Sequence, residues 1–372
     1  MRVALVVPGG VDRSGEYRVI PALLALLAQL TRHHQVEVLA LQQEPRADSW
    51  QLAGAHIHNI GARRTRARAL RRLLALHRTA RFDVLHAIWS GPCSLVAVTA
   101  GRLLRVPALV HVAGGELVAL ADIGYGGAFR WRSRVREHLT LRAAAAVTAA
   151  SAPAVAQLAA WGVRAERVPL GVDLAAWPAR APRRRETQRP ARLLHVASLN
   201  AVKDQGTLLH ALRALPDECA CHLDIVGEDT LGGRVQRLAA ELGLEARVRF
   251  HGFLPQRELR PLVERADLLV VSSRHETGPL VALEAAVAGV PTVGTAVGHI
   301  AEWAAAGAAL AVPPADPGAL AAAIRAVLAD EAQRLHMAHA AQCRALAEDA
   351  VHTARAFTEL YARVAGVLPA RA

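Results

Sequence analysis

The sequence predicts an α/β protein built from two doubly wound domains, each with a parallel sheet. Short apolar runs of strand length alternate with segments of helical periodicity along the whole chain. This alternation occurs twice, and Trp177–Pro190 (WPARAPRRRETQRP), which has no apolar period, separates the two halves. With 372 residues, 53% of them hydrophobic, the chain is long enough to fill two cores.

The first domain is predicted over residues 1–175, and residues 176–190 are expected to form a linker. Apolar residues at helical spacing predict helices in this domain over Tyr17–Leu30 and Arg66–His77, among others. Its expected strands are Arg2–Val7, Gln35–Leu41, His56–Ile60, Phe82–Ala87, Pro107–Val112 and Ala145–Ala149.

The second domain is predicted over residues 191–350. Helical segments over Pro317–Ala347 and Val351–Val364 follow its strands. Because open parallel sheets bind ligands at the carboxyl ends of their strands, a cleft between two such domains is the expected ligand site. The expected strands are Arg192–Ala197, Cys221–Val226, Val248–His251, Leu268–Val271, Pro291–Gly294 and Ala309–Val312.

Two glutamates eight positions apart mark a candidate site. Glu276 lies in the turn after a predicted strand, and Glu284 lies inside the helix predicted over Pro279–Ala288. A helix N-terminus can hold a phosphate, and carboxylates accept hydrogen bonds from sugar and ribose hydroxyls. The backbone N–H groups at this helix start belong to Gly278, Leu280 and Val281. The alternative is an N-capping glutamate followed by a solvated helix charge.

A single lysine marks a second loop. Of the 44 basic Lys and Arg residues only Lys203 is a lysine, and it lies in the loop Ser198–Gln205 between a predicted strand and the helix Gly206–Leu215. A compact ammonium on a flexible stem suits a diphosphate. The alternative is a lysine retained by chance.

Together these segments resemble family 4 retaining glycosyltransferases. That family has the GT-B fold, in which two Rossmann-like domains face each other across a cleft. The segments are, in order, VALVVPGGVDRSGEYRVIPAL, RFDVLHAIW, RVPLGVDLAAW, the Lys203 loop, LDIVGED, RVRFHGFLP and the paired glutamates followed by AAVAGVPTVGT. The resemblance covers nearly the whole chain. It implies a hexosyltransferase that moves a sugar from a nucleotide sugar to a glycan, lipid-linked or small-molecule acceptor, in a setting such as cell-envelope polysaccharide synthesis.

The resemblance also implies roles for single residues. Lys203 would contact the donor diphosphate, Glu276 the transferred sugar and Glu284 the ribose. A C-terminal helix at about residues 351–366 would pack back on the first domain. The other positions that match the donor site are Gly9, Gly10, Ser198, Asn200, Gly252, Phe253, Leu254, Arg274, Gly278, Leu280 and Val281.

Three positions depart from the family pattern. Ser198 stands where an arginine is usual, and Arg274, beside Glu276 in the sequence, is the candidate substitute. Ala113 stands where many members have a histidine, and Leu170 replaces an asparagine. Acceptor loops of the family vary; here they are expected at residues 12–17, 89–94 and 114–127.

No metal and no cofactor are expected, and the nucleotide sugar is a co-substrate. The sequence has no DxD pair for a carboxylate-bound divalent cation. Its cysteines are too few and too scattered for a disulfide framework, and Cys219-Ala-Cys221-His222 is interpreted as a strand edge instead of half a metal site. With no apolar run of membrane-spanning length and a strand at the N-terminus, a cytoplasmic protein is expected.

The formal charge of +12 leaves two interpretations open. The basic clusters Arg63–Arg72 and Arg130–Arg136, the second with Trp131, suit either an anionic membrane surface or a solvated arginine-rich face. Peripheral contact with the inner face of a membrane is therefore one expectation. Nucleic acid is not an expected partner, because no recognition module accompanies the charge.

Two other functions stay open at this point. A GT-B nucleotide-sugar 2-epimerase would need acids in the cleft, and Asp12, Glu116 and Asp122 are available. A non-catalytic nucleotide-binding protein, for example one that binds NAD through PGGVDRSG, is the third possibility, although this loop is not G-x-G-x-x-G.

Overall fold

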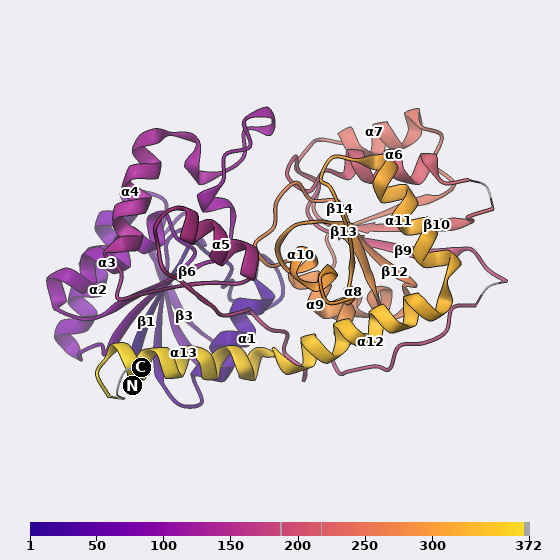
Figure 1. The fold of residues 1–372 in the computed structure, drawn as a ribbon. Helices are drawn as coiled ribbons and strands as arrows, with labels where there is room; N and C mark the ends of the chain where they lie inside the picture. Colours follow the sequence, from indigo (N-terminus) through magenta and orange to yellow (C-terminus); the bar gives the residue numbers. More distant parts are fainter. Residues whose placement is uncertain (187, 217, 368–372) are drawn as a thin grey trace. The chain divides into compact units, whose positions relative to one another are not determined.

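The computed structural model describes residues 1–186, 188–216 and 218–367. The chain divides into two compact units. Unit 1 comprises Met1–Asp173 and the chain from Glu348 onward, and unit 2 comprises Leu174–Ala347. Each unit contains one sheet with helices packed against it (Figure 1). The predicted pair of doubly wound α/β units is confirmed.

The unit 1 sheet has the order β3-β4-β2-β1-β5-β6-β7-β8. All neighbours pair in parallel except β3, which is antiparallel to β4. The central strands are apolar runs, as in β1, because helices cover both faces. The strands are β1 (Arg2–Val7), β2 (Gln35–Ala40), β3 (Asp48–Leu52), β4 (Ala55–Asn59), β5 (Val84–Ile88), β6 (Ala108–Val112), β7 (Ala146–Ala149) and β8 (Glu166–Arg167).

Two buried clusters form the core of unit 1, one on each face of the sheet. The C-terminal helix α13 belongs to the same cluster as α1, and its buried Tyr361 hydroxyl lies 2.8 Å from His86 Nδ1. The helices are α1 (Pro21–Leu30), α2 (Thr65–Thr79), α3 (Pro92–Leu104), α4 (Trp131–Arg142), α5 (Ala152–Ala160) and α13 (Ala350–Val364), with short 3-10 turns η1 (Gly115–Leu117), η2 (Ala121–Ile123) and η3 (Gly127–Phe129).

The unit 2 sheet is parallel throughout, in the order β11-β10-β9-β12-β13-β14. This is the 3-2-1-4-5-6 order of dinucleotide-binding folds. Its strands are β9 (Ala191–Val196), β10 (Cys221–Val226), β11 (Val248–Gly252), β12 (Leu268–Val271), β13 (Thr292–Thr295) and β14 (Leu310–Val312). Its helices are α6 (Gln205–Ala214), α7 (Arg234–Glu241), α8 (Gln256–Arg265), α9 (Leu280–Val287), α10 (Gly298–Ala304), α11 (Pro317–Ala329) and α12 (Glu331–Ala347).

The proline- and arginine-rich segment 178–190 has no helix or strand among its described residues, and it is bonded to unit 2. Arg189 donates to both carboxylate oxygens of the fully buried Asp267, at 2.8 and 3.2 Å, and Arg183 lies 3.3 Å from the same group. A buried carboxylate needs such partners. The arginines of this segment therefore stabilise unit 2.

The structure adds elements that the sequence pattern did not predict. Strand β3 and the two-residue β8 are edge strands, partly exposed and polar, so they lack the apolar run on which the prediction relied. The helical region expected over 317–347 consists of two helices, α11 and α12. Asp330 has extended backbone at the break, and its carboxylate accepts the Gln333 N–H at 2.9 Å.

None of the helices in the described part of the chain is long and apolar enough to cross a membrane.

Candidate functional site

The order of strands in the unit 2 sheet reverses between neighbours β9 and β12. Doubly wound folds bind ligands outside the carboxyl ends of the strands at such a switch point. The loop after β9 carries Lys203, and the loop after β12 carries Glu276. The Lys203 ammonium forms an ion pair with a carboxylate oxygen of Glu276, which also accepts the Ser273 hydroxyl at 2.7 Å. Both predicted catalytic residues therefore meet at the switch point.

Main-chain contacts hold these two loops together. The Ser272 hydroxyl donates to the Lys203 carbonyl at 2.8 Å, and the Arg274 N–H donates to the Val202 carbonyl at 2.7 Å. The Lys203 N–H in turn donates to the Asn200 carbonyl at 3.1 Å. Because none of these bonds uses the lysine side chain, its ammonium is positioned by a loop that does not depend on it.

A buried histidine lies beneath the Lys203 loop. The pKa of His195 is lowered to about 4 by burial, with smaller effects from its bond to Val270 and from nearby Lys203. Its neutral ring donates from Nδ1 to the Val270 carbonyl at 2.9 Å, and Gln205 bridges from His195 Nε2, at 3.2 Å, to the Ser198 carbonyl, at 3.1 Å. His195 therefore supports the loop without adding charge. Neither His195 nor Gln205 was predicted as a site residue, although a histidine inside the apolar run RLLHV is a visible signal in the sequence.

Glu284 lies inside α9, where it is 3% exposed. Its carboxylate accepts a hydrogen bond from Gln256 Nε2 at 3.0 Å, and the side-chain Oε1 of Gln256 accepts from Trp177 Nε1 at 2.8 Å. Burial raises the pKa of Glu284 to about 7, and the Gln256 bond lowers it only in part. This glutamate is not the solvated helix charge of the alternative interpretation.

Helix α9 begins four positions after Glu276. Leu280 is the first helical residue, and Pro279 is the N-cap, so the proline stands one position before the first turn in which it was expected. The other predicted phosphate-binding positions, Gly278 and Val281, flank this start and are partly exposed. The free backbone N–H groups at the start of α9 and the Lys203 ammonium both contribute positive potential to this site.

The remaining predicted donor positions in unit 2 lie in neighbouring loops. Gly252 ends β11 with a φ of +68°, and Phe253, which follows it, is 47% exposed. The loops after β9 and β10 approach each other closely at Gly227. A Cβ added to Gly227 would lie 1.9 Å from the Ala197 carbonyl oxygen, so only glycine fits at this position. Ser198 is exposed at this junction. These loops follow β9, β10 and β11, so they lie at one edge of the sheet.

The glycines predicted in unit 1, Gly9 and Gly10, follow β1. Gly10 has a φ of +80°, and an added Cβ would lie 2.5 Å from the Ile20 side chain. The protein's own packing therefore requires a glycine there.

A cavity of about 1150 Å³ lies in unit 1. Strand order in that sheet reverses between β1 and β5, and Pro8 and Trp89, which follow these strands, both line the cavity. Two of the three segments predicted as acceptor loops contribute to the lining, 89–94 and 114–127. Segment 12–17 is not among the lining residues.

Two glutamates anchor the cavity loops. Glu116 accepts the Ser90 N–H at 3.0 Å and the Gly114 N–H at 2.8 Å, and Glu137 of α4 accepts the Gly91 N–H at 3.0 Å. Burial raises the pKa of Glu116, with the charge of Glu137 adding to the effect and the backbone donors opposing it. Both carboxylates are used to hold loop backbone.

One group of side chains has the composition of a metal site. Ligand atoms of Glu37, His56 and His58 lie within 4.8 Å of one another. However, Arg2 donates to Glu37 at 2.8 Å, and Arg72 lies 3.1 Å from His58 Nδ1. A metal-bound histidine needs its second ring nitrogen as a donor, and two guanidiniums repel a cation. We therefore assign an ion-pair network here. Cys219 and Cys221 are free thiols.

Two families match the chain. The family described as "Glycosyl transferases group 1" matches residues 180–344, which contain the Lys203 and Glu276 loops. The "Glycosyl transferase 4-like domain" matches residues 19–171.

Curated relatives match over part of their length. A glycogen synthase of Mycobacterium tuberculosis is 37% identical over 166 residues, which is 43% of this chain and 39% of that protein. A D-inositol 3-phosphate glycosyltransferase of Corynebacterium urealyticum is 38% identical over 128 residues, 34% of this chain and 30% of that protein. The chain thus spans less than half the length of these relatives.

Solved structures match over nearly all of the chain. Sucrose-phosphate synthase from Thermosynechococcus elongatus has a TM-score of 0.82 and 20% identity, covering 99% of this chain and 100% of that one. Anabaena HepE in complex with UDP-glucose has a TM-score of 0.75 and 19% identity, covering 97% and 99%. At these identities the structures establish the GT-B fold. The two family models match residues 180–344 to the glycosyl transferases group 1 and residues 19–171 to the glycosyl transferase 4-like domains.

Proposed function

We propose that the chain is a hexosyltransferase that moves a sugar from a nucleotide-sugar donor to an acceptor with retention of anomeric configuration. The observation that carries the proposal is the Lys203–Glu276 pair at the switch point of the unit 2 sheet. A cation, a carboxylate and a helix N-terminus at one edge of a parallel sheet are groups that suit a sugar diphosphate, which supports the proposal. The proposal that the anomeric configuration is retained rests on the family resemblance.

The ion pair suggests how the donor enters. In the structure Glu276 neutralises the Lys203 ammonium. A donor diphosphate competes for that ammonium and releases the Glu276 carboxylate to accept hydrogen bonds from sugar hydroxyls. When the bond to the anomeric carbon breaks, charge grows on the diphosphate oxygens, and Lys203 with the α9 N-terminus stabilises it.

For the acceptor we propose the unit 1 cavity at the β1–β5 switch point. Trp89 and Tyr125 give it flat apolar surface on which a ring can stack, and backbone of the 89–94 and 114–127 segments supplies polar groups. We name no general base, because Glu116 and Glu137 already hold backbone N–H groups.

The test is a thermal-shift screen of UDP, GDP, ADP and dTDP with their sugars, followed by a transfer assay with the best donor. Because Anabaena HepE was solved in complex with UDP-glucose, UDP sugars are the first donors to test. At one hundred times its Kd a ligand stabilises the folded state by about 2.7 kcal/mol, or roughly 5–10 °C for a domain of this size. Transfer or slow donor hydrolysis supports the proposal. An epimerised product, or binding without turnover, would contradict it.

We expect activity to persist in EDTA. The sequence has no DxD pair, and Lys203 with the α9 N-terminus is proposed to balance the leaving-group charge. Initial rates with and without chelator, on enzyme dialysed against EDTA, measure this. A strict requirement for magnesium or manganese would disprove the proposed charge stabilisation.

A further inference from the structure

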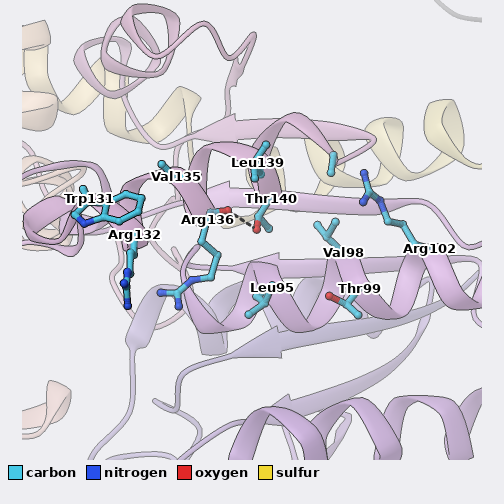
Figure 2. Close-up of a pocket in the computed structure, with 11 residues that line it drawn as sticks. Leu95, Val98, Thr99, Arg102, Trp131, Arg132, Val135, Arg136, Leu139 and Thr140 are labelled. Carbon is cyan, nitrogen blue, oxygen red and sulfur yellow. Dashed lines mark hydrogen bonds between the residues drawn. The ribbon is translucent and has the colours of Figure 1, made fainter.

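A groove of about 440 Å³ runs between α3 and α4 on the surface of unit 1. Its walls combine apolar and basic side chains, and Figure 2 shows both kinds along the two helices. The lining residues are Leu95, Val98, Thr99, Arg102, Trp131, Arg132, Val135, Arg136, Leu139, Thr140 and Ala143.

The apolar side of α4 faces solvent. Trp131, Val135 and Leu139 are spaced four residues apart, so they form one stripe on the helix, and they are 69%, 49% and 62% exposed. A surface helix normally turns such a stripe to the core. Phe129, two positions before α4 in the chain, and Leu103, next to the groove residue Arg102 in the chain, are also exposed, at 51% and 62%. An exposed apolar stripe of this kind marks a binding surface.

Arginines surround this stripe. Arg102, Arg132 and Arg136 line the groove, and no acidic residue is among the described lining residues. The one glutamate of α4, Glu137, is buried and bonded to the Gly91 N–H. Helix α2, which packs beside α3 (Figure 1), carries further exposed arginines. The surface is therefore apolar in its centre and positive around it.

We propose that the α3–α4 surface docks on an anionic lipid bilayer. A bilayer offers a negative layer and an apolar interior a few ångströms apart, which matches arginines that flank a stripe of Trp, Val and Leu. The Trp131 ring suits the headgroup boundary, and the arginine stems lie along apolar surface with their guanidiniums at the phosphates.

Other occupants match less of the surface. A second copy of the chain in a two-fold contact would place the arginine set against itself. A nucleic acid would pair with the guanidiniums but leave the Trp131, Val135 and Leu139 stripe in water. Of these three occupants, the bilayer alone engages both components. The inference does not rest on the proposed sugar transfer.

The test is co-sedimentation of the full chain with vesicles of phosphatidylcholine mixed with phosphatidylglycerol. We expect binding to these vesicles, little binding to pure phosphatidylcholine, and loss of binding at about 1 M NaCl, where the screening length is about 3 Å. Trp131→Ser/Leu139→Ser should weaken binding at least about tenfold, from the apolar area lost. Arg102→Gln/Arg132→Gln should weaken it about fivefold per arginine.

Matched controls are Val351→Ser, at an apolar residue of α13 that is 53% exposed, and Arg213→Gln, at an exposed arginine of unit 2. Both should bind like the wild type. Because all mutated side chains are exposed, melting temperatures should not change, and light scattering should give the same mass for every variant. Wild-type vesicle binding by the Trp131/Leu139 variant, no binding to anionic vesicles at low salt, or a changed oligomeric state instead of changed binding would overturn the proposal.

Discussion

Lys203→Ala is expected to lower turnover of the nucleotide sugar more than a hundredfold, which corresponds to about 3 kcal/mol of transition-state stabilisation. The ammonium would lose its role at the moment when charge moves onto the leaving diphosphate. Binding of the plain nucleoside should hardly change, since it lacks that charge. The fold should persist, because the loop is held through the Lys203 main chain. Steady-state kinetics with the donor found in the screen measures the effect.

Lys203→Arg tests whether position matters as well as charge. A planar guanidinium cannot occupy the place of a compact ammonium beside Glu276, so full activity should not return. Arg213→Ala is the matched control, because this exposed residue lies in the last turn of α6, the helix that follows the Lys203 loop. Near-wild-type turnover in Lys203→Ala would remove the main support for the proposed transferase chemistry.

The alternation of apolar runs was enough to predict the central strands. Parallel strands such as β1 and β12 are covered on both faces, so their sequences are continuous apolar runs. Strand β3 (DSWQL) failed this criterion because it is an exposed edge that pairs with β4 alone. Composition did not show which contacts hold segment 178–190. Arg183 and Arg189 bind the buried Asp267, which lies roughly eighty positions later in the chain.

For the site, sequence order predicted which loops carry function but not which side chains touch. Lys203 and Glu276 follow two strands that become neighbours only in the folded sheet, so their ion pair could not be foreseen. From the sequence, Glu284 was expected to lie on the helix within reach of a ribose. Its burial depends on Gln256 and Trp177, which come from α8 and from the segment before β9, and no local pattern encodes that contact.

Glu284 should make the stability of unit 2 fall as pH rises. Its pKa is about 7 in the folded protein, against an ordinary value of 4.5. Between these pH values the unfolded chain releases a proton that the folded chain retains, so unfolding becomes easier as pH increases. The contribution lost between pH 5 and pH 8 is about 2.5 kcal/mol.

Glu284→Gln removes this titration while keeping an oxygen that accepts from Gln256. Relative to the wild type, the variant should therefore gain about 2.5 kcal/mol between pH 5 and pH 8, measured by urea denaturation at each pH. Taking the difference between the two proteins cancels every other titrating group. Glu245→Gln, at an exposed glutamate, is the control and should follow the wild type at all pH values. A pH-independent difference for Glu284→Gln would show that Glu284 is not held in a proton-retaining site.

The same proton should govern nucleotide affinity if ribose hydroxyls donate to Glu284. The carboxylate accepts two hydroxyls best when ionised, so wild-type affinity should fall as pH drops below about 7. Ligand phosphates titrate in a similar range, but they do so equally with both proteins. The affinity ratio of wild type to Glu284→Gln, measured by calorimetry, should therefore rise with pH and level off above the pKa. A ratio that stays constant would place the ribose away from Glu284, even if the stability prediction holds.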